Sequence, residues 1–319
     1  MSCVCLQASK DGWHKKDTCR TYRTGIAKIM KKEESFGDYE KDTRSWITLA
    51  SGEYYPDILI DACQLYAPVL VTFDKLLKSS HSSTDFFKTI MSVPNQWMRT
   101  QLCRVFKKYV SPQTPVEMLK KKCDAEKTCE QFGDGFRCIA EVQKKFRGRP
   151  VPDEALCAVL WEYKDRGKKG YDLTERMFDL LRSLHPNLTI LGPERAGKDV
   201  LLGRIFEDYP KPDRPVDFVI KDSETILAIG LARYDSDRGG SQEDDRPGQY
   251  REVASEIIAY ASKHQMDHLK VIYVNDGPGL LLGSMWNDYA NIEFQGKGRV
   301  RVVTLRMISE RITSQWLRS

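Results

Sequence analysis

The sequence predicts an α+β protein (α/β in the wider sense), with a helical N-terminal domain over residues 1–165 and a mixed-sheet domain over residues 166–319. Three observations predict this organisation. A chain of 319 residues is longer than one small hydrophobic core requires. Apolar residues in the first half recur at the three-to-four spacing of amphipathic helices. The second half instead alternates short apolar runs, typical of strands, with helical segments.

The first half contains four segments with helical periodicity, separated by prolines and glycines. They cover residues 58–77, 84–91, 95–109 and 115–122. The net charge of +5 conceals basic runs, at residues 28–32, 107–108, 120–122, 144–149 and 168–169. Such runs either neutralise the phosphates of a nucleic acid or form solvated helix faces. We therefore expect the helical domain to contribute DNA contacts or subunit contacts.

The cysteines and the apolar runs indicate the cellular compartment of the protein. Because no apolar run reaches the roughly eighteen residues of a membrane span, we expect no membrane association. The first residues lack the apolar core of a signal peptide, which predicts a cytoplasmic protein with its nine cysteines reduced. Two loose groups could hold structural Zn²⁺, the first being Cys3, Cys5, His14 and Cys19, and the second Cys123, Cys129, Cys138 and Cys157. Neither has paired Cys-x-x-Cys spacing, so buried free thiols are the alternative.

The second half predicts helices and strands in an order that requires a mixed sheet with helices packed against it. The expected helices cover residues 173–184, 199–206, 247–263 and 281–290, and the expected strands cover residues 188–191, 216–220, 225–234, 270–274 and 299–305. The strands over 216–220 and 225–234 form a hairpin with a tight turn at Asp222-Ser223. Pro247 suits the first turn of its helix, whose apolar face contains Val253, Ile257, Ile258 and Ala261.

The most informative segment runs from Asp217, at the start of the first hairpin strand, through the loop that follows the second. Five acidic residues and three arginines lie between Arg233 and Arg246, around Gly239-Gly240. Carboxylate oxygens are the protein ligands that Mg²⁺ prefers, and arginines balance the charge of a phosphate. Two adjacent glycines let the backbone approach a phosphate closely. The alternative is a solvated turn with internal ion pairs.

Asp217, preceded by Pro215, resembles the first half of the PD-(D/E)xK nuclease motif. The sequence of residues 232–246 resembles that of type II restriction endonucleases of that superfamily. It reads Ala-Arg-Tyr-Asp-Ser-Asp-Arg-Gly-Gly-Ser-Gln-Glu-Asp-Asp-Arg. The resemblance covers residues 192–274. It implies a restriction-endonuclease-like catalytic core, a Mg²⁺ cofactor, double-stranded DNA as substrate, a homo- or hetero-oligomer, and the cytoplasm of a prokaryotic cell.

The sequence departs from this motif at its second half. With a two-residue turn at Asp222-Ser223, Asp217 lies opposite Ala228, and Ala228, Gly230 and Ala232 share one face of the second strand. The motif requires a carboxylate there, followed two residues later by a lysine, and neither is present. Residues from elsewhere in the chain would have to replace both the carboxylate and the lysine.

Three explanations compete for the missing carboxylate. In the first, the carboxylate has moved into the loop or the next helix, and Arg233 lies near the lysine position. Asp217 and Glu243 then bind Mg²⁺, and Asp244 and Glu252 are further candidates for the second carboxylate. Alternatively, Asp235 and Asp237 carry the metal at the strand end. In the third, Gly230 occupies the position of the glutamate and leaves a weakened or inactive chain.

The remaining polar residues of the segment suit contacts with DNA. Arg233 cannot shuttle protons, because the pKa of arginine lies above about 12, so its expected role is to clamp the scissile phosphate. Arg238 and Arg246 are expected to position the DNA backbone or read guanine edges, and Gln242 to read a base.

A competing motif lies just upstream. Residues 192–198 fit Gly-x-x-x-x-Gly-Lys between a strand and a helix, as in a phosphate-binding loop, and Asp276 ends a later apolar strand. Asp199, however, stands where a serine or threonine should hold Mg²⁺. Arg195 and Lys198 could instead face DNA phosphates. The sequence therefore predicts a Mg²⁺-dependent type II restriction endonuclease, with a nucleotide hydrolase and a non-catalytic DNA-binding subunit as alternatives.

Overall fold

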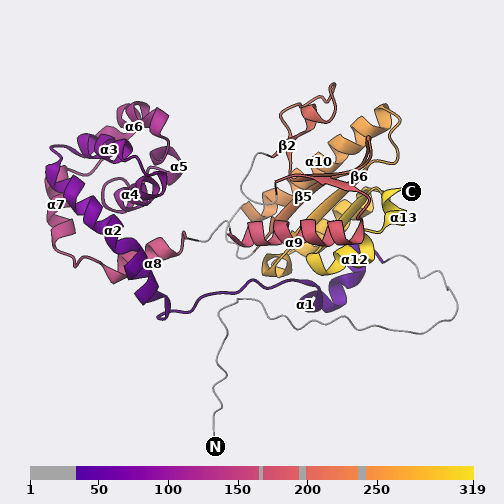
Figure 1. Cartoon of the computed structure of the whole chain (residues 1–319), viewed down its shortest axis with the longest axis horizontal. Coiled ribbons are helices and arrows are strands. Elements are labelled where there is room, and N and C mark those ends of the chain that lie inside the picture. Colours follow the sequence, from indigo (N-terminus) through magenta and orange to yellow (C-terminus); the bar gives the residue numbers. More distant parts are fainter. Residues whose placement is uncertain (1–33, 165–167, 194–198, 236–241) are drawn as a thin grey trace, which may run out of the picture. The chain divides into compact units, whose positions relative to one another are not determined.

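The structure, a computed structural model, describes residues 34–164, 168–193, 199–235 and 242–319, apart from the side chains of residues 168–169 and 242–246. These residues form two compact units, one of helices and one built on a sheet (Figure 1). The sheet unit contains a five-stranded mixed sheet and a two-stranded antiparallel one, which confirms the predicted α+β fold class. Within the described residues, every helix is too short or too polar to span a bilayer.

The helical unit begins at Gly52 and contains the four predicted helical segments. Its helices are α2 (Ile58–Ser79), α3 (Ser83–Ser92), α4 (Gln96–Tyr109), α5 (Val116–Leu119), α6 (Ala125–Phe132), α7 (Ile139–Arg147) and α8 (Glu154–Trp161). Polar side chains cap three of them, because Ser82, Asn95 and Asp153 accept the N–H groups of Asp85, Met98 and Leu156. The core contains a row of aromatic rings, in which Phe146 contacts Phe73, Phe73 contacts Phe86, and Phe86 contacts Phe106.

The sheet unit has helices on both faces of its five strands (Figure 1). The strands are β1 (Thr189–Leu191), β4 (Phe218–Asp222), β5 (Thr225–Tyr234), β6 (Lys270–Asp276) and β7 (Val300–Val303), in this spatial order. β4 is antiparallel to both of its neighbours, β1 and β5, whereas β5, β6 and β7 run parallel to one another. Further elements are α9 (Lys168–Leu184), α10 (Gln242–Lys263), α11 (Met285–Gln295), α12 (Ile308–Arg311), α13 (Ser314–Leu317) and the small sheet of β2 (Val200–Leu201) with β3 (Pro215–Val216).

The two faces of the sheet are distinguished by the helices that cover them. On one face the ring of Phe178 in α9 contacts Phe218 of β4. On the other, Tyr273 of β6 donates a hydrogen bond to the backbone oxygen of Tyr250 in α10, over 2.7 Å. Because side chains alternate along a strand, each residue of β5 and β6 belongs to either the α9 face or the α10 face.

The segment over residues 34–51 packs in the sheet unit, although the sequence assigns it to the helical domain. It contains a 3₁₀ turn over Phe36–Asp42 and the short helix α1 (Thr43–Trp46). Phe36 is fully buried and its ring stacks on Trp286 at 4.4 Å. So short a segment has no amphipathic period from which its packing partner could be predicted.

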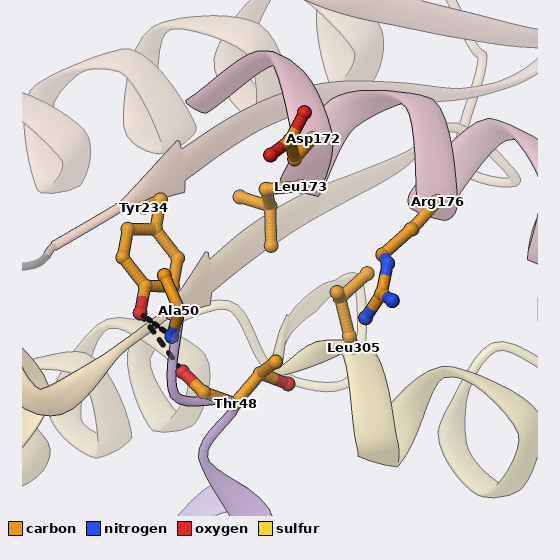
Figure 2. A pocket seen from close by; sticks show the side chains of 7 residues that line it. All are labelled: Thr48, Ala50, Asp172, Leu173, Arg176, Tyr234 and Leu305. Carbon is orange, nitrogen blue, oxygen red and sulfur yellow. Dashed lines mark hydrogen bonds between the residues drawn. The ribbon is translucent and has the colours of Figure 1, made fainter. Parts of the chain in front are cut away.

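Hydrogen bonds join the segment over residues 34–51 to the carboxyl ends of β5 and β6. Tyr234 accepts a hydrogen bond from the N–H of Ala50 (2.6 Å) and donates one to the backbone oxygen of Thr48 (3.1 Å), as Figure 2 shows. Leu173 of α9 and Leu305 line the same small pocket as this ring (Figure 2). The paired residue on β6, Asp276, accepts the N–H groups of Thr48 (2.6 Å), Gly277 (2.7 Å) and Leu305 (3.0 Å).

We expect Asp276→Asn to lower the free energy of unfolding by about 2–3 kcal/mol, because an amide N–H₂ would then face backbone donors inside a buried site. Chemical denaturation measures this loss. Asp267→Asn, at an exposed carboxylate, is the matched control and should change the free energy by less than about 0.5 kcal/mol. Equal stability of the two variants would contradict this role of Asp276.

Most predicted elements of the sheet unit are present, with two corrections. The helix expected over residues 199–206 is wrong: the chain continues from Asp199 into β2 and then a 3₁₀ turn, Leu202–Arg204. Helix α10 begins at Gln242, five residues before the predicted start at Pro247. Acidic residues favour the first turn of a helix through its dipole, which explains why the acidic end of the loop is helical. The apolar face of α10 was predicted correctly.

The predicted hairpin register is also wrong. Asp222 pairs with Thr225, so the turn consists of Ser223 and Glu224, and Ser223 adopts a φ of 54°. A β-bulge between Ile220 and Lys221 then shifts the ladder once more, and Phe218 pairs with Gly230. Asp217 therefore does not pair with Ala228.

Candidate functional site

Asp217 lies at the bend between β3 and β4 and is held against the middle of β5. Its N–H donates to the backbone oxygen of Gly230 (3.0 Å), and its carboxylate accepts the N–H of Ala232 (2.7 Å). These two bonds bracket Leu231, so the residue opposite Asp217 is Leu231. Residues 231 and 233 therefore occupy the places of the expected carboxylate and lysine.

The small-residue face of β5 has a different role from the one predicted. Gly230 lies under the ring of Phe218, and a Cβ atom there would stand 1.9 Å from the ring carbon Cζ. The face of Ala228, Gly230 and Ala232 is thus the α9 face, filled by the core. Gly230 is not the position of a missing glutamate, and this explanation is wrong.

A second carboxylate stands beside Asp217. The pair Val200–Val216 is the last of the β2–β3 ladder, and Asp199 and Asp217 are the next residue on each strand. Burial raises the pKa of the Asp217 carboxyl, and the negative charge of Asp199 raises it further. The N–H of Ala232 and the charge of Arg233 act in the opposite direction. Asp199 is exposed, so it lies where solvent reaches the pair.

Arg233 is held in place near the same carboxylate. Its Nε donates to Asp235 over 2.7 Å, and its side chain shares a hydrogen bond with Tyr250 of α10. Asp235 is itself fixed, because its N–H donates to the backbone oxygen of Asp276 (2.7 Å) and its carbonyl accepts from Gly279 (2.8 Å). The guanidinium has five N–H donors, more than these two bonds require.

Asn275 adds a polar group that sequence reasoning missed. It pairs with Arg233 across the parallel ladder, so its side chain lies on the α10 face. The residue is only 1% exposed, and within the described part of the chain neither the nitrogen nor the oxygen of its amide has a hydrogen-bond partner. A buried amide without partners is costly, which indicates a place for a ligand or a water molecule. The only signal for it in the sequence is its position at the end of an apolar strand.

The cluster of Asp199, Asp217, Arg233, Asp235 and Asn275, with Tyr250 beside it, lies around the carboxyl ends of β5 and β6, on the side from which the chain enters α10. Ligands of open sheets with parallel strands bind at such ends, and the start of a helix favours anions. The carboxylates of Asp199 and Asp217 suit a cation, and the guanidinium of Arg233, which is paired with the third carboxylate, Asp235, suits a phosphate.

The contacts of Glu252 lie away from the cluster around Asp217. Glu252 is exposed and pairs with Lys211 (3.3 Å), in a network in which Lys211 and Arg214 also bind Glu256. The charged groups that shift the pKa of Asp217 are Asp199 and Arg233, with no contribution from Glu252. The structure therefore does not bring Glu252 to the site.

Several predicted residues lie outside the described parts of the chain. Glu243 and Asp244 fall in the first turn of α10, but their side chains are not described, and the same holds for Gln242 and Arg246. The others are Arg195, Lys198, Asp237, Arg238, and the first zinc group of Cys3, Cys5, His14 and Cys19.

The second zinc group is not assembled. Among the described residues, no three His, Cys, Asp or Glu side chains gather as metal ligands. Cys123 and Cys138 are exposed, and Cys157 is buried with a hydrogen bond to Cys63. These cysteines are free thiols.

The nucleotide-hydrolase alternative loses its structural basis. A phosphate-binding loop leads into a helix, whereas the chain here enters β2 directly after Asp199. Asp276 is bound by three backbone N–H groups and holds the segment over residues 34–51. Comparisons of the chain with protein-family models, with curated proteins and with solved structures give no match.

Proposed function

We propose that the protein is a Mg²⁺-dependent endonuclease that hydrolyses phosphodiester bonds of double-stranded DNA, in the manner of a type II restriction endonuclease. The observation that carries the proposal is the meeting of Asp217, Asp199 and Arg233 at the carboxyl end of β5. The resemblance of residues 232–246 to such enzymes leads to the same reaction.

The two aspartates fit a magnesium ion. Mg²⁺ is bound in proteins by one or two carboxylates, with water and phosphate as the other ligands. Burial and, after it, the neighbouring negative charge of Asp199 raise the pKa of the Asp217 carboxyl, so both disfavour its ionised state. A bound divalent cation would offset this cost. Asp217 and Asp199 would hold the ion, which when bound activates a water molecule and neutralises charge on the phosphate.

The other residues of the cluster position the substrate. Arg233 binds the scissile phosphate through its guanidinium, and Asp235 and Tyr250 fix the orientation of that group. Asn275 offers a donor and an acceptor to a phosphate oxygen or to a water molecule. Arginine does not move protons at neutral pH, so Arg233 acts by charge.

The test is incubation of a mixture of long DNA molecules with the full chain and Mg²⁺. We expect discrete fragments from the wild type, no cleavage in excess EDTA, and a rate lowered at least about 100-fold in Asp217→Ala, because metal sites depend this strongly even on the groups that support their ligands. Asp222→Ala, at the other end of β4 and paired with Arg318 on the surface, is the control and should cut normally.

A second candidate function is favoured by Leu231, which stands opposite Asp217 where a carboxylate is expected. A chain with this replacement could bind DNA as one subunit of a heteromeric endonuclease and leave the cutting to its partner. Tight DNA binding without cleavage in the same assay would favour this candidate. Turnover of Mg²⁺-ATP with intact DNA would contradict both.

A further inference from the structure

A hollow in the helical unit is lined by a combination of side chains that the proposed site does not use. Its volume is about 450 Å³. Its lining consists of Tyr66, Gln96, Trp97, Thr100, Gln101, Arg104, Tyr163 and Lys164. Pockets for organic ligands have volumes of this order, roughly 300–1,000 Å³.

The lining is built mainly from one face of α4. Residues 96, 97, 100, 101 and 104 of that helix recur at the spacing that places side chains on the same side. Tyr66 of α2 forms the floor, is 1% exposed, and donates its hydroxyl hydrogen to the backbone oxygen of Leu160 (3.1 Å). The residues that follow α8, Tyr163 and Lys164, complete the lining. The hollow is thus lined by α2, α4 and the segment after α8, and it is part of the packed unit.

Its aromatic rings offer surfaces for stacking. Trp97 is 44% exposed, and its ring lies nearly parallel to that of Tyr66, with centroids 6.3 Å apart and 15° between the planes. The exposed part of the Trp97 ring offers an apolar surface on which another flat ring can stack. Positive charges are supplied by Arg104 and Lys164. The Arg104 guanidinium lies 5.0 Å from the centre of the Tyr163 ring, and the Lys164 ammonium lies 3.6 Å from that of the Trp161 ring.

The composition of the lining selects the ligand. The two charged residues of the lining are both cations, so an anionic ligand is favoured and a cationic one, such as a methylated amine, is disfavoured. Amide groups of Gln96 and Gln101 suit the polar edges of bases, and Gln101 is oriented by Arg104, which donates to it over 2.9 Å. A nucleotide of DNA combines such a ring system with polar edges and a negative charge.

We propose that this hollow binds one nucleotide of a DNA strand, with its base stacked on Trp97 and its phosphate near Arg104 and Lys164. The faces of a base are covered inside a duplex, so this nucleotide must lie outside the helical stack. The inference rests on the proposed function, because the bound strand belongs to the DNA that the proposed nuclease cuts. It adds recognition of an unpaired or extruded nucleotide by the helical unit.

The test compares two fluorescently labelled duplexes, one fully paired and one with a single extra nucleotide, with the full chain in EDTA to prevent cutting. We expect the wild type to bind the bulged duplex more tightly, and Trp97→Ala to weaken that binding about tenfold or more, since stacking on an aromatic ring contributes this much per base. Trp97→Phe keeps a ring and should bind within about threefold of the wild type. Tyr54→Ala, at another exposed aromatic residue of the same unit, is the control.

A photochemical readout separates this role from a merely structural one. With 5-iodouracil as the extra base, we expect a crosslink to Trp97 or Tyr163, located by mass spectrometry. Binding of the bulged duplex by Trp97→Ala within twofold of the wild type, with unchanged circular dichroism, would overturn the proposal. Loss of cleavage in Asp217→Ala tests the nuclease independently, because that residue lies in the other unit.

Discussion

Replacing Asp199 by asparagine is expected to lower the rate of Mg²⁺-dependent DNA cleavage by more than about 100-fold, because the change removes one of two carboxylates that would hold the ion. Asparagine keeps the size of the side chain, so the small sheet of β2 and β3 should remain intact. Cleavage of DNA under single-turnover conditions, over a series of Mg²⁺ concentrations, measures the effect. Part of the loss should be recovered at high Mg²⁺ concentration.

The control for this variant is Asp213→Asn, which changes an exposed aspartate shortly before β3. It should cut as the wild type does. A wild-type rate and Mg²⁺ dependence in Asp199→Asn would remove Asp199 from the site and leave Glu243 or Asp244, the first-turn residues of α10, as the source of the second carboxylate. Asp217→Ala would still be inactive in that case.

Substituting glutamate for Gly230 is expected to unfold the sheet unit rather than to improve the site. The new side chain would meet the buried ring of Phe218 and would place a charge in the core under α9. We expect the free energy of unfolding to fall by more than about 3 kcal/mol, the sum of overpacking and burial of an unpaired charge. Chemical denaturation monitored by circular dichroism measures this.

The matched variant is Leu231→Glu, one residue along β5. Leu231 is half-buried and stands opposite Asp217, so a glutamate there reaches the site without meeting Phe218. We expect this protein to fold and to need less Mg²⁺ for cleavage. Gly170→Glu, in α9 where an added Cβ meets nothing within 4 Å, controls for the change of charge. Wild-type stability of Gly230→Glu would contradict the packing described for Phe218.

The elements of the sheet unit could largely be predicted because burial leaves a clear pattern in the sequence. Residues 225–234 are bounded by turn residues, and β5 covers the same residues. The strand predicted over residues 270–274 contains a continuous apolar run, residues 271–274, as expected for β6 between two parallel neighbours. Asp217 could be singled out because a charged residue between two apolar strands is conspicuous.

The geometry of the site could not be predicted, because it depends on single residues that change the pairing. One positive φ at Ser223 and one bulge at Lys221 move the register, and with it the face on which each side chain of β5 lies. Asp199 joins Asp217 only through a ladder of two residue pairs, which is too short to have a periodic pattern. Asn275 ends an apolar strand, and nothing in its neighbours indicates that its amide lacks partners.

The attachment of residues 34–51 to the sheet unit has a consequence for the order in which the chain folds during synthesis. The helical unit is made of one continuous stretch and can fold as soon as it has been translated. The sheet unit must wait, because the N–H of Thr48 reaches its acceptor only when Asp276 has been made, 228 residues later. Until then the early segment carries an exposed Phe36 with no Trp286 to cover it. Contacts between such distant residues slow folding, so the nascent chain presents a finished helical unit beside an incomplete sheet, which is the stage most open to aggregation or to capture by a chaperone.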